Sequence, residues 1–205
     1  EDSQKTIDKL WKAYIGTILD FSAEGKDTKE DFNRAMNETI ASIKKAKMES
    51  SIPFSVFKPT GLARFSLLEK ISNNSELSEN ERLEKCAFEN RIENICKTAS
   101  ENKVPVFIDA EESWIQNSID EIAIRMMRKF NQKEVFIFNT LQLYRHDRVK
   151  YLEDILITAR EEKFFIGLKL VRGAYHEQEI DRAKKEGYNC PVHLKKEDTD
   201  SDYNQ

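Results

Sequence analysis

Polar and charged side chains follow the ends of several short apolar segments of the sequence. Short uninterrupted apolar segments are typical of strands buried on both faces of a parallel sheet, and ligands of parallel α/β proteins bind at the carboxyl ends of strands. An acid, an amide and cations gathered there can hold a charged small molecule and stabilise negative charge that develops on it. The candidates are Lys58, Asp109, Glu111, Thr140, Gln142, Lys169, Arg172, Gly173 and Tyr175.

Each candidate also has a purely structural interpretation. Asp109 is placed to cap a helix or to stabilise a turn. Lys58 precedes Pro59-Thr60-Gly61 and suits a solvated loop, and Gln142 suits the edge of a core. Gly173 suits a tight turn between a strand and a helix, since glycine relieves the backbone there. Considered one by one, these residues do not establish a function.

Four apolar segments predict the strands that position these residues. Amphipathic helical patterns lie between them, and strands that alternate with helices indicate βαβ units and a parallel sheet. A closed barrel of this kind needs eight strands and about 250 residues. We therefore expect an α/β fold, a partial TIM-like (β/α) barrel with about four parallel strands. We also expect exposed strand edges at 54–57 and 164–171, through which the chain can self-associate. The predicted strands are Pro53–Lys58, Val104–Ile108, Val135–Phe138 and Phe164–Val171.

A helical arm is predicted before the first of these strands. Apolar residues from Ile7 to Leu19 recur at the spacing of one helix face. Asp27 or Thr28 can cap a second helix that runs to about Met48. We divide the chain into this arm, residues 1–50, and the first half of a (β/α)8 barrel, residues 51–205, truncated at the carboxyl terminus.

Composition excludes several classes of function. The chain has 33 basic and 37 acidic residues, a net charge of −4, and no basic stripe for nucleic acid. No apolar run reaches the roughly 18 residues that cross a bilayer. The three cysteines are scattered, which favours a reducing compartment without disulfides. The three histidines are scattered as well and predict no metal site. His176 could begin a zinc-protease helix, but Ile180 stands where that motif needs its second histidine.

Six segments, in order and spacing, resemble the proline dehydrogenase family, and the similarity runs from about residue 10 to the end. The most specific are Val106–Glu112 (VFIDAEE), Asn139–Tyr144 (NTLQLY) and Lys169–Tyr175 (KLVRGAY) followed by Glu179. The others are Leu19–Gly25 (LDFSAEG), Phe57–Leu62 (FKPTGL) and the tail from Gly187 to Asn204.

The resemblance implies a distorted barrel in which FAD oxidises L-proline to pyrroline-5-carboxylate and a membrane quinone takes the electrons. It places Asp109 and Lys169 at the reacting centre, and Lys58, Tyr175 and Glu24 around the substrate, with Lys58 on its carboxylate and Glu24 as an acidic gate. Family members carry either Arg or Lys at the position of Lys169. The flavin contacts it implies are Ala110, Gln142, Val171, Arg172 and Gly173.

The same resemblance implies a pair of adjacent arginines on the last barrel helix as the main substrate clamp, and no adjacent arginines occur in this sequence. We therefore expect the chain alone to be inactive and to bind FAD weakly. The implied location is the cytoplasm or the periphery of a membrane facing a reducing compartment, which is the mitochondrial inner membrane in a eukaryote. Two alternatives stay open: a non-catalytic half-barrel that associates with itself or with a partner, and a different flavin barrel such as a folate reductase.

Overall fold

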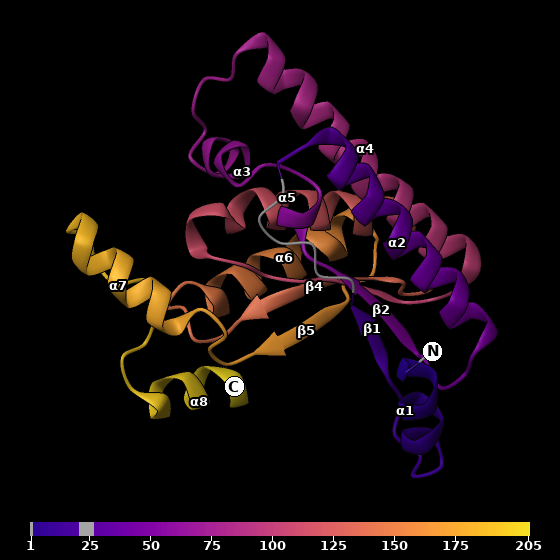
Figure 1. Cartoon of the computed structure of the whole chain (residues 1–205). Helices are drawn as coiled ribbons and strands as arrows, with labels where there is room; N and C mark the ends of the chain where they lie inside the picture. The colour runs from indigo at the N-terminus through magenta and orange to yellow at the C-terminus, as the bar shows by residue number, and fades with distance from the viewer. Residues whose placement is uncertain (1, 21–26) are drawn as a thin grey trace.

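The computed structural model describes residues 2–20 and 27–205. They form one sheet with helices around it (Figure 1). Glu24 therefore lies outside the described residues. The strands are β1 (Ile18–Asp20), β2 (Phe54–Phe57), β3 (Val106–Ile108), β4 (Ile137–Gln142) and β5 (Leu168–Val171). The helices are α1 (Asp2–Trp11), α2 (Lys29–Met48), the 3-10 turn η1 (Pro59–Gly61), α3 (Phe65–Ser72), α4 (Glu79–Asn102), α5 (Ser113–Phe130), α6 (Arg148–Glu162), α7 (His176–Glu186) and α8 (Lys196–Asn204).

All five strands are parallel, and their order in the sheet is their order in the chain. Because crossovers between parallel strands are right-handed, an unreversed order puts every connecting helix on the same face of the sheet. Helices α2, α4, α5 and α6 lie together on one side of the strands (Figure 1). This is the winding of a (β/α) barrel, and it differs from a doubly wound sheet, in which the strand order reverses.

The helix-covered face of the sheet holds the core. Side chains alternate between the two faces along a strand, so Val106, Ile108 and Ile137 point toward the helices, where they are fully buried. They pack in one cluster with Ile92 and Ile95 of α4 and with the apolar face of α5. In the described part of the chain, the opposite face carries no helix between successive strands, and it is the inner face of the barrel winding.

The structure confirms the expected class of fold and the four predicted strands. The prediction of a helix through Leu19 is wrong at its end, because α1 stops at Trp11 and Ile18–Asp20 pairs with Phe54–Val56 as a fifth strand. The predicted exposed edge at Phe54–Phe57 is wrong for the same reason, since β1 covers it, while β5 is an edge strand as expected. None of the helices in the described ranges is long and apolar enough to cross a membrane.

Candidate functional site on the inner face of the sheet

Strand register places several of the predicted residues on the inner face. Thr140 pairs with Lys169, and Phe107 pairs with Phe138. Residues paired in a parallel sheet point to the same side, and so do residues two positions apart on one strand. Asp109 therefore lies on the same face as Phe107, and Gln142 on the same face as Thr140. Val56 pairs with Phe107, and Lys58 follows Val56 by two residues. The inner face therefore gathers Lys58, Asp109, Gln142 and Lys169 at the carboxyl ends of β2, β3, β4 and β5.

Asp109 and Lys169 form an ion pair across this face, although β4 lies between their strands. The two side chains keep 21% and 30% of their surface exposed, so the pair is open to solvent and to a ligand. The Lys169 ammonium also lies 5.4 Å from the centroid of the Phe107 ring, a distance at which a cation is attracted to the ring face. The structure thus brings together the two residues assigned to the reacting centre.

An aromatic layer forms the floor beneath this ion pair. The rings of Phe54 and Phe107 are stacked with centroids 4.5 Å apart, and the ring of Phe138 meets both edge-on at 5.7 Å and 5.5 Å. All three residues are only half-buried. A half-buried aromatic layer beside an ion pair can receive a flat ring or an apolar side chain.

Glu111 fixes the loop that carries Lys58. Its carboxylate accepts hydrogen bonds from the Thr60 backbone N–H at 2.9 Å and from the Thr60 hydroxyl at 2.5 Å. Burial raises the pKa of Glu111 to about 7, although the hydrogen bonds from Thr60 and the charge of Lys58 oppose the shift. The clamp joins the loop after β2 to the loop after β3. It holds Lys58 close enough for its positive charge to favour the ionised form of the Glu111 carboxylate.

The side-chain amide of Gln142 makes its hydrogen bonds to other residues of the protein. Its amide nitrogen donates to the Glu111 carbonyl at 2.6 Å and to the Tyr144 hydroxyl at 2.9 Å, and its amide oxygen accepts from Arg145 at 3.3 Å. The side chain is 1% exposed. In this arrangement Gln142 ties the ends of β3 and β4 together and presents no free amide N–H to the inner face.

The Tyr144 hydroxyl joins this network to the turn after β5. Besides the bond from Gln142, it accepts a long hydrogen bond from the Tyr175 backbone N–H at 3.4 Å. Burial is the main cause that raises the pKa of Tyr144 to about 12, so the phenol stays neutral in the physiological range. Tyr175 is half-buried beside this bond.

The remaining predicted flavin contacts lie around the ends of β3 and β5. Ala110 is buried directly after Asp109, and Val171 pairs with Gln142 on the inner face. Arg172 faces α8, where it pairs with Asp200 and lies 3.7 Å from the centroid of the Tyr203 ring. Gly173 is exposed next to it. Arg172 is therefore engaged by the tail of the chain, away from the Asp109–Lys169 pair.

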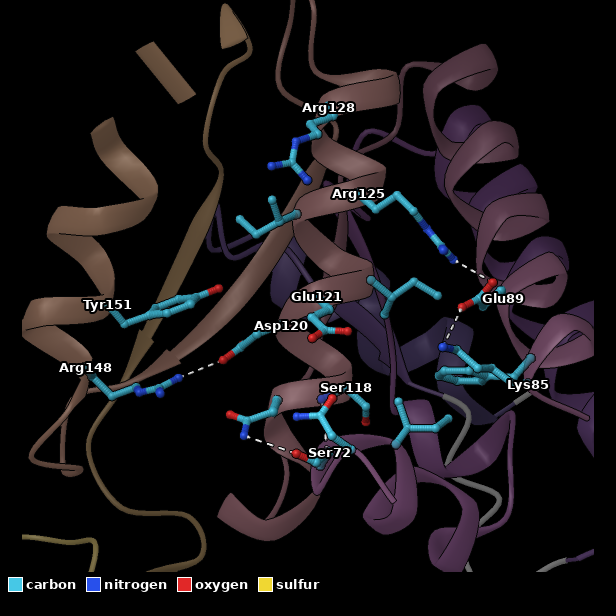
Figure 2. A pocket seen from close by; sticks show the side chains of 16 residues that line it. Ser72, Lys85, Glu89, Ser118, Asp120, Glu121, Arg125, Arg128, Arg148 and Tyr151 are labelled. Atoms are coloured by element: carbon cyan, nitrogen blue, oxygen red, sulfur yellow. Dashed lines mark hydrogen bonds and ion pairs between the residues drawn. The ribbon is translucent and has the colours of Figure 1, made fainter. Parts of the chain in front are cut away.

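A separate cavity of about 530 Å³ lies among the helices α3 to α6 (Figure 2). Its charged side chains are mostly engaged with one another, as in the Arg148–Asp120 pair at 2.7 Å and the Arg125–Glu89 pair at 3.2 Å. Asp120 is buried and also accepts hydrogen bonds from Gln116 and Asn139 at 2.8 Å each. This network supports the sheet from the helix side and does not reach the inner face.

Two supporting residues could not be assigned roles from their own spacing. Glu179 is fully buried on α7 and binds Ser113 at the start of α5, and Asn131 is fully buried at the end of α5 and binds the starts of β4 and β5. Polar residues in amphipathic patterns predict solvent exposure, so neither was distinguishable from a surface residue. The resemblance gave the one available signal, since Glu179 belongs to its motif. No group of three or more potential metal ligands is present in residues 2–20 and 27–205.

Comparison with known proteins identifies the family of the chain. A sequence model of the proline dehydrogenase family matches residues 3–205. The chain is 31% identical over 204 residues to the carbapenem antibiotics biosynthesis protein CarD of Pectobacterium carotovorum, covering 100% of this chain and 53% of CarD. It is 29% identical over 247 residues to mitochondrial proline dehydrogenase 1 of Arabidopsis thaliana, covering 100% of this chain and 50% of the relative.

The fold has a counterpart among solved structures. Proline utilization A from Bdellovibrio bacteriovorus, inactivated by N-propargylglycine, superimposes with a TM-score of 0.81 at 17% identity, covering 98% of this chain and 22% of that protein. The chain spans about half the length of CarD and of the Arabidopsis protein. The family match over nearly the whole sequence shows that the chain belongs to the proline dehydrogenase family, a family of flavin-dependent oxidoreductases.

Proposed function

We propose that this chain forms the first half of an FAD-dependent barrel that oxidises L-proline to pyrroline-5-carboxylate and passes the electrons to a membrane quinone. The observation that carries the proposal is the Asp109–Lys169 ion pair on the inner face, above the Phe107 ring. An acid and a cation that remain accessible at the carboxyl ends of parallel strands are suited to a charged reaction. The family match supports the flavin and proline chemistry.

The residues present fit a flavin at this face. The accessible Lys169 ammonium can stabilise the negative charge of a reduced flavin ring, and the half-buried phenylalanines offer it a flat apolar surface. We assign Ala110, Val171 and Gly173 to contacts along the ring, and Gln142 and Arg172 to its edge. When bound, FAD supplies the acceptor for the hydride that leaves the substrate carbon. Gln142 needs a change of hydrogen-bond partner for its role, and Arg172 needs to release Asp200.

The substrate contacts are assigned to the same edge of the sheet. Lys58 offers a point charge for the carboxylate of L-proline, and the Glu111–Thr60 clamp holds its loop in place. Asp109 would face the substrate amine in this assignment, and Tyr175 would form a wall of the pocket. Glu24 is assigned to a gate over the pocket and lies outside the described residues. One lysine is a weak carboxylate site, so this half alone is expected to bind proline poorly.

The location we propose is the cytoplasm or the periphery of a membrane facing a reducing compartment. Several eukaryotic relatives are named as mitochondrial proline dehydrogenases, which supports the mitochondrial inner membrane if the source is a eukaryote. A quinone in that membrane is the electron acceptor that we propose.

Titration of the chain with FAD tests the cofactor assignment. Flavin fluorescence should be quenched saturably, with a Lys169→Met variant binding about tenfold more weakly than the wild type. Lys150→Met, at an exposed lysine on α6, is the matched control and should leave the affinity unchanged. Equal affinity of wild type and Lys169→Met, or no saturable quenching at all, would contradict the proposed flavin site. The chain alone should reduce little or no dye with L-proline, and rapid dye reduction would contradict the incomplete pocket.

Self-association is a second proposal, and the edge strand β5 favours it. Leu170 is 39% exposed on β5, Phe165 ahead of this strand is 52% exposed, and Ile157 on α6 is 53% exposed. An unpaired strand edge beside apolar side chains favours pairing with another chain. Light scattering should show a mass that rises with concentration, and Leu170→Lys should restrict the rise. A strict monomer at high concentration would contradict this proposal and leave the flavin site untouched.

A further inference from the structure

A second cavity, of about 310 Å³, lies between the first turns of α2, the start of α3 and the first half of α4. These three helices are on the opposite side of the molecule from α8 (Figure 1). The apolar walls of the cavity include Phe32, Leu67 and Leu83. Phe32 and Leu67 are buried, whereas Leu83 is 66% exposed at the surface. The cavity thus has an apolar interior and an accessible entrance.

Arg91 of α4 lines this cavity as a buried charge that lacks an acidic partner. It is 7% exposed and has no ion pair within the described residues. Its Nε donates to the Asn33 side chain at 2.8 Å and its Nη1 donates to the Leu62 carbonyl at 3.1 Å, so Nη2 has no hydrogen bond to any described residue. The guanidinium lies 5.4 Å from the centroid of the Phe32 ring. Removing a charge from water without a counter-charge is costly, and burial accordingly lowers the pKa of Arg91.

The charges around Arg91 leave the cavity positive. Arg64 is neutralised by Glu84, to which its Nε donates at 2.8 Å. Lys29 lines the cavity without an ion pair in the described part of the chain, and Asp27 is the one further acid in the lining. Three cations therefore face two acids. A ligand that brings one negative charge and an apolar tail would complement both the guanidinium and the walls.

We propose that this cavity binds a small amphiphilic monocarboxylate, with the carboxylate on Arg91 and the hydrocarbon chain between Phe32, Leu67 and Leu83. Guanidinium binds carboxylate through parallel N–H···O bonds, and the free Nη2 provides one of the donors. The volume is at the lower end of the range for small-molecule sites. This site is distinct from the inner face and does not depend on the flavin proposal.

Calorimetric titration of the full chain with octanoate tests the proposal, with octyltrimethylammonium as the ligand of opposite charge. Octanoate should bind to one site at least tenfold more tightly than the cation. Leu83→Glu adds a negative charge at the entrance without removing a bond of Arg91, and it should weaken octanoate binding at least tenfold. Leu156→Glu, at a half-exposed leucine on α6, is the matched control and should bind as the wild type does.

Arg91→Lys keeps the charge but loses the planar fork, and it should weaken octanoate binding while leaving the far-ultraviolet dichroism spectrum unchanged. Equal binding of octanoate and the cation, or equal affinity of Leu83→Glu and Leu156→Glu, would overturn the proposal. A third outcome would also overturn it: the wild type does not bind octanoate but cosediments with phosphatidylglycerol vesicles, and Leu83→Glu does not cosediment. The ligand would then be a membrane surface.

Discussion

Glu179 on α7 accepts two hydrogen bonds from Ser113 at the start of α5, each 2.6 Å long, one from the backbone N–H and one from the hydroxyl. The two residues are 66 positions apart. The first N–H groups of a helix have no partner within the helix, and a carboxylate there is favoured by the helix dipole. A residue from a distant helix therefore serves as the cap of α5, and it fixes α7 against the start of α5.

Loss of this cap should destabilise the chain. Glu179→Gln removes the charge from a fully buried pair of hydrogen bonds and is expected to cost about 1–2 kcal/mol of unfolding free energy. In a double-mutant cycle with Ser113→Ala, urea unfolding should give a coupling energy of about 1 kcal/mol. Glu177→Gln, at an exposed acid in the first turn of the same helix, is the control. Additive costs of the two substitutions would contradict direct capping.

Glu111 should make stability fall as pH rises toward neutrality. Its pKa is raised from 4.5 to about 7 in the folded chain, so between these values the folded state holds a proton that the unfolded state has released. The contribution to stability is complete below about pH 4.5 and is lost as pH rises through 7, by on the order of 3 kcal/mol in total.

Glu111→Gln stays neutral and can still bond to Thr60, so it should lack this dependence. Urea unfolding of both proteins at pH 5, 6, 7 and 8 provides the measurement. The stability of the wild type should decline relative to the variant across the series. Parallel pH profiles for the two proteins would show that the buried carboxyl group does not titrate in this range.

Asn131 should be among the residues most sensitive to truncation. Its amide donates to the Ile137 and Phe165 carbonyls and accepts from the Phe136 and Ile137 N–H groups, at 2.8 to 3.1 Å. Asn131→Ala leaves these groups without partners in a fully buried position and should cost about 3 kcal/mol or more. Asn90→Ala, at an exposed asparagine on α4, should cost nothing measurable. A loss below about 1 kcal/mol for Asn131→Ala would mean that water replaces the missing amide.

Gly167 should not tolerate a side chain. A Cβ there would lie 2.6 Å from the Ile137 carbonyl oxygen and 2.7 Å from a Val135 methyl carbon, and the carbonyl cannot move without displacing β4. We expect Gly167→Ala to cost about 1–3 kcal/mol, the usual cost of overpacking. Gly61→Ala is the control, because a Cβ there meets its nearest neighbour at 4.0 Å. Thermal unfolding of the two variants compares them, and similar midpoints would contradict the predicted clash.

Local sequence patterns are sufficient to predict β2 to β5 and the helices α4, α5 and α6, because each has a strong period and clear breaks. The Thr28 cap was also predictable, and its hydroxyl oxygen accepts from the Asp31 N–H. The apolar spacing of α1 continues through Leu19 and predicts a helix there, whereas pairing with β2 makes Ile18–Asp20 a strand. The α3 helix (Phe65–Ser72) was not predicted at all.

Positions at the strand ends were predictable as a group, whereas the partners of individual side chains were not. The Asp109–Lys169 pair spans 60 residues and the Thr60–Glu111 clamp spans 51. Such pairs depend on which strands are neighbours, and periodicity does not contain that information. The engagement of Arg172 by Asp200 and Tyr203 was likewise outside the reach of local patterns.

The sequential strand order has a consequence for how the molecule opens. Among residues 2–20 and 27–205, each strand is hydrogen-bonded only to strands adjacent in the chain, so a terminal unit can detach without breaking the ladder between the others. β3 is flanked on both sides by two further strands, and β1 and β5 are flanked on one side only. Amide protons of Val106 to Ile108 should thus exchange with solvent last, and the molecule should fray from both ends toward its centre as an array of repeated units does.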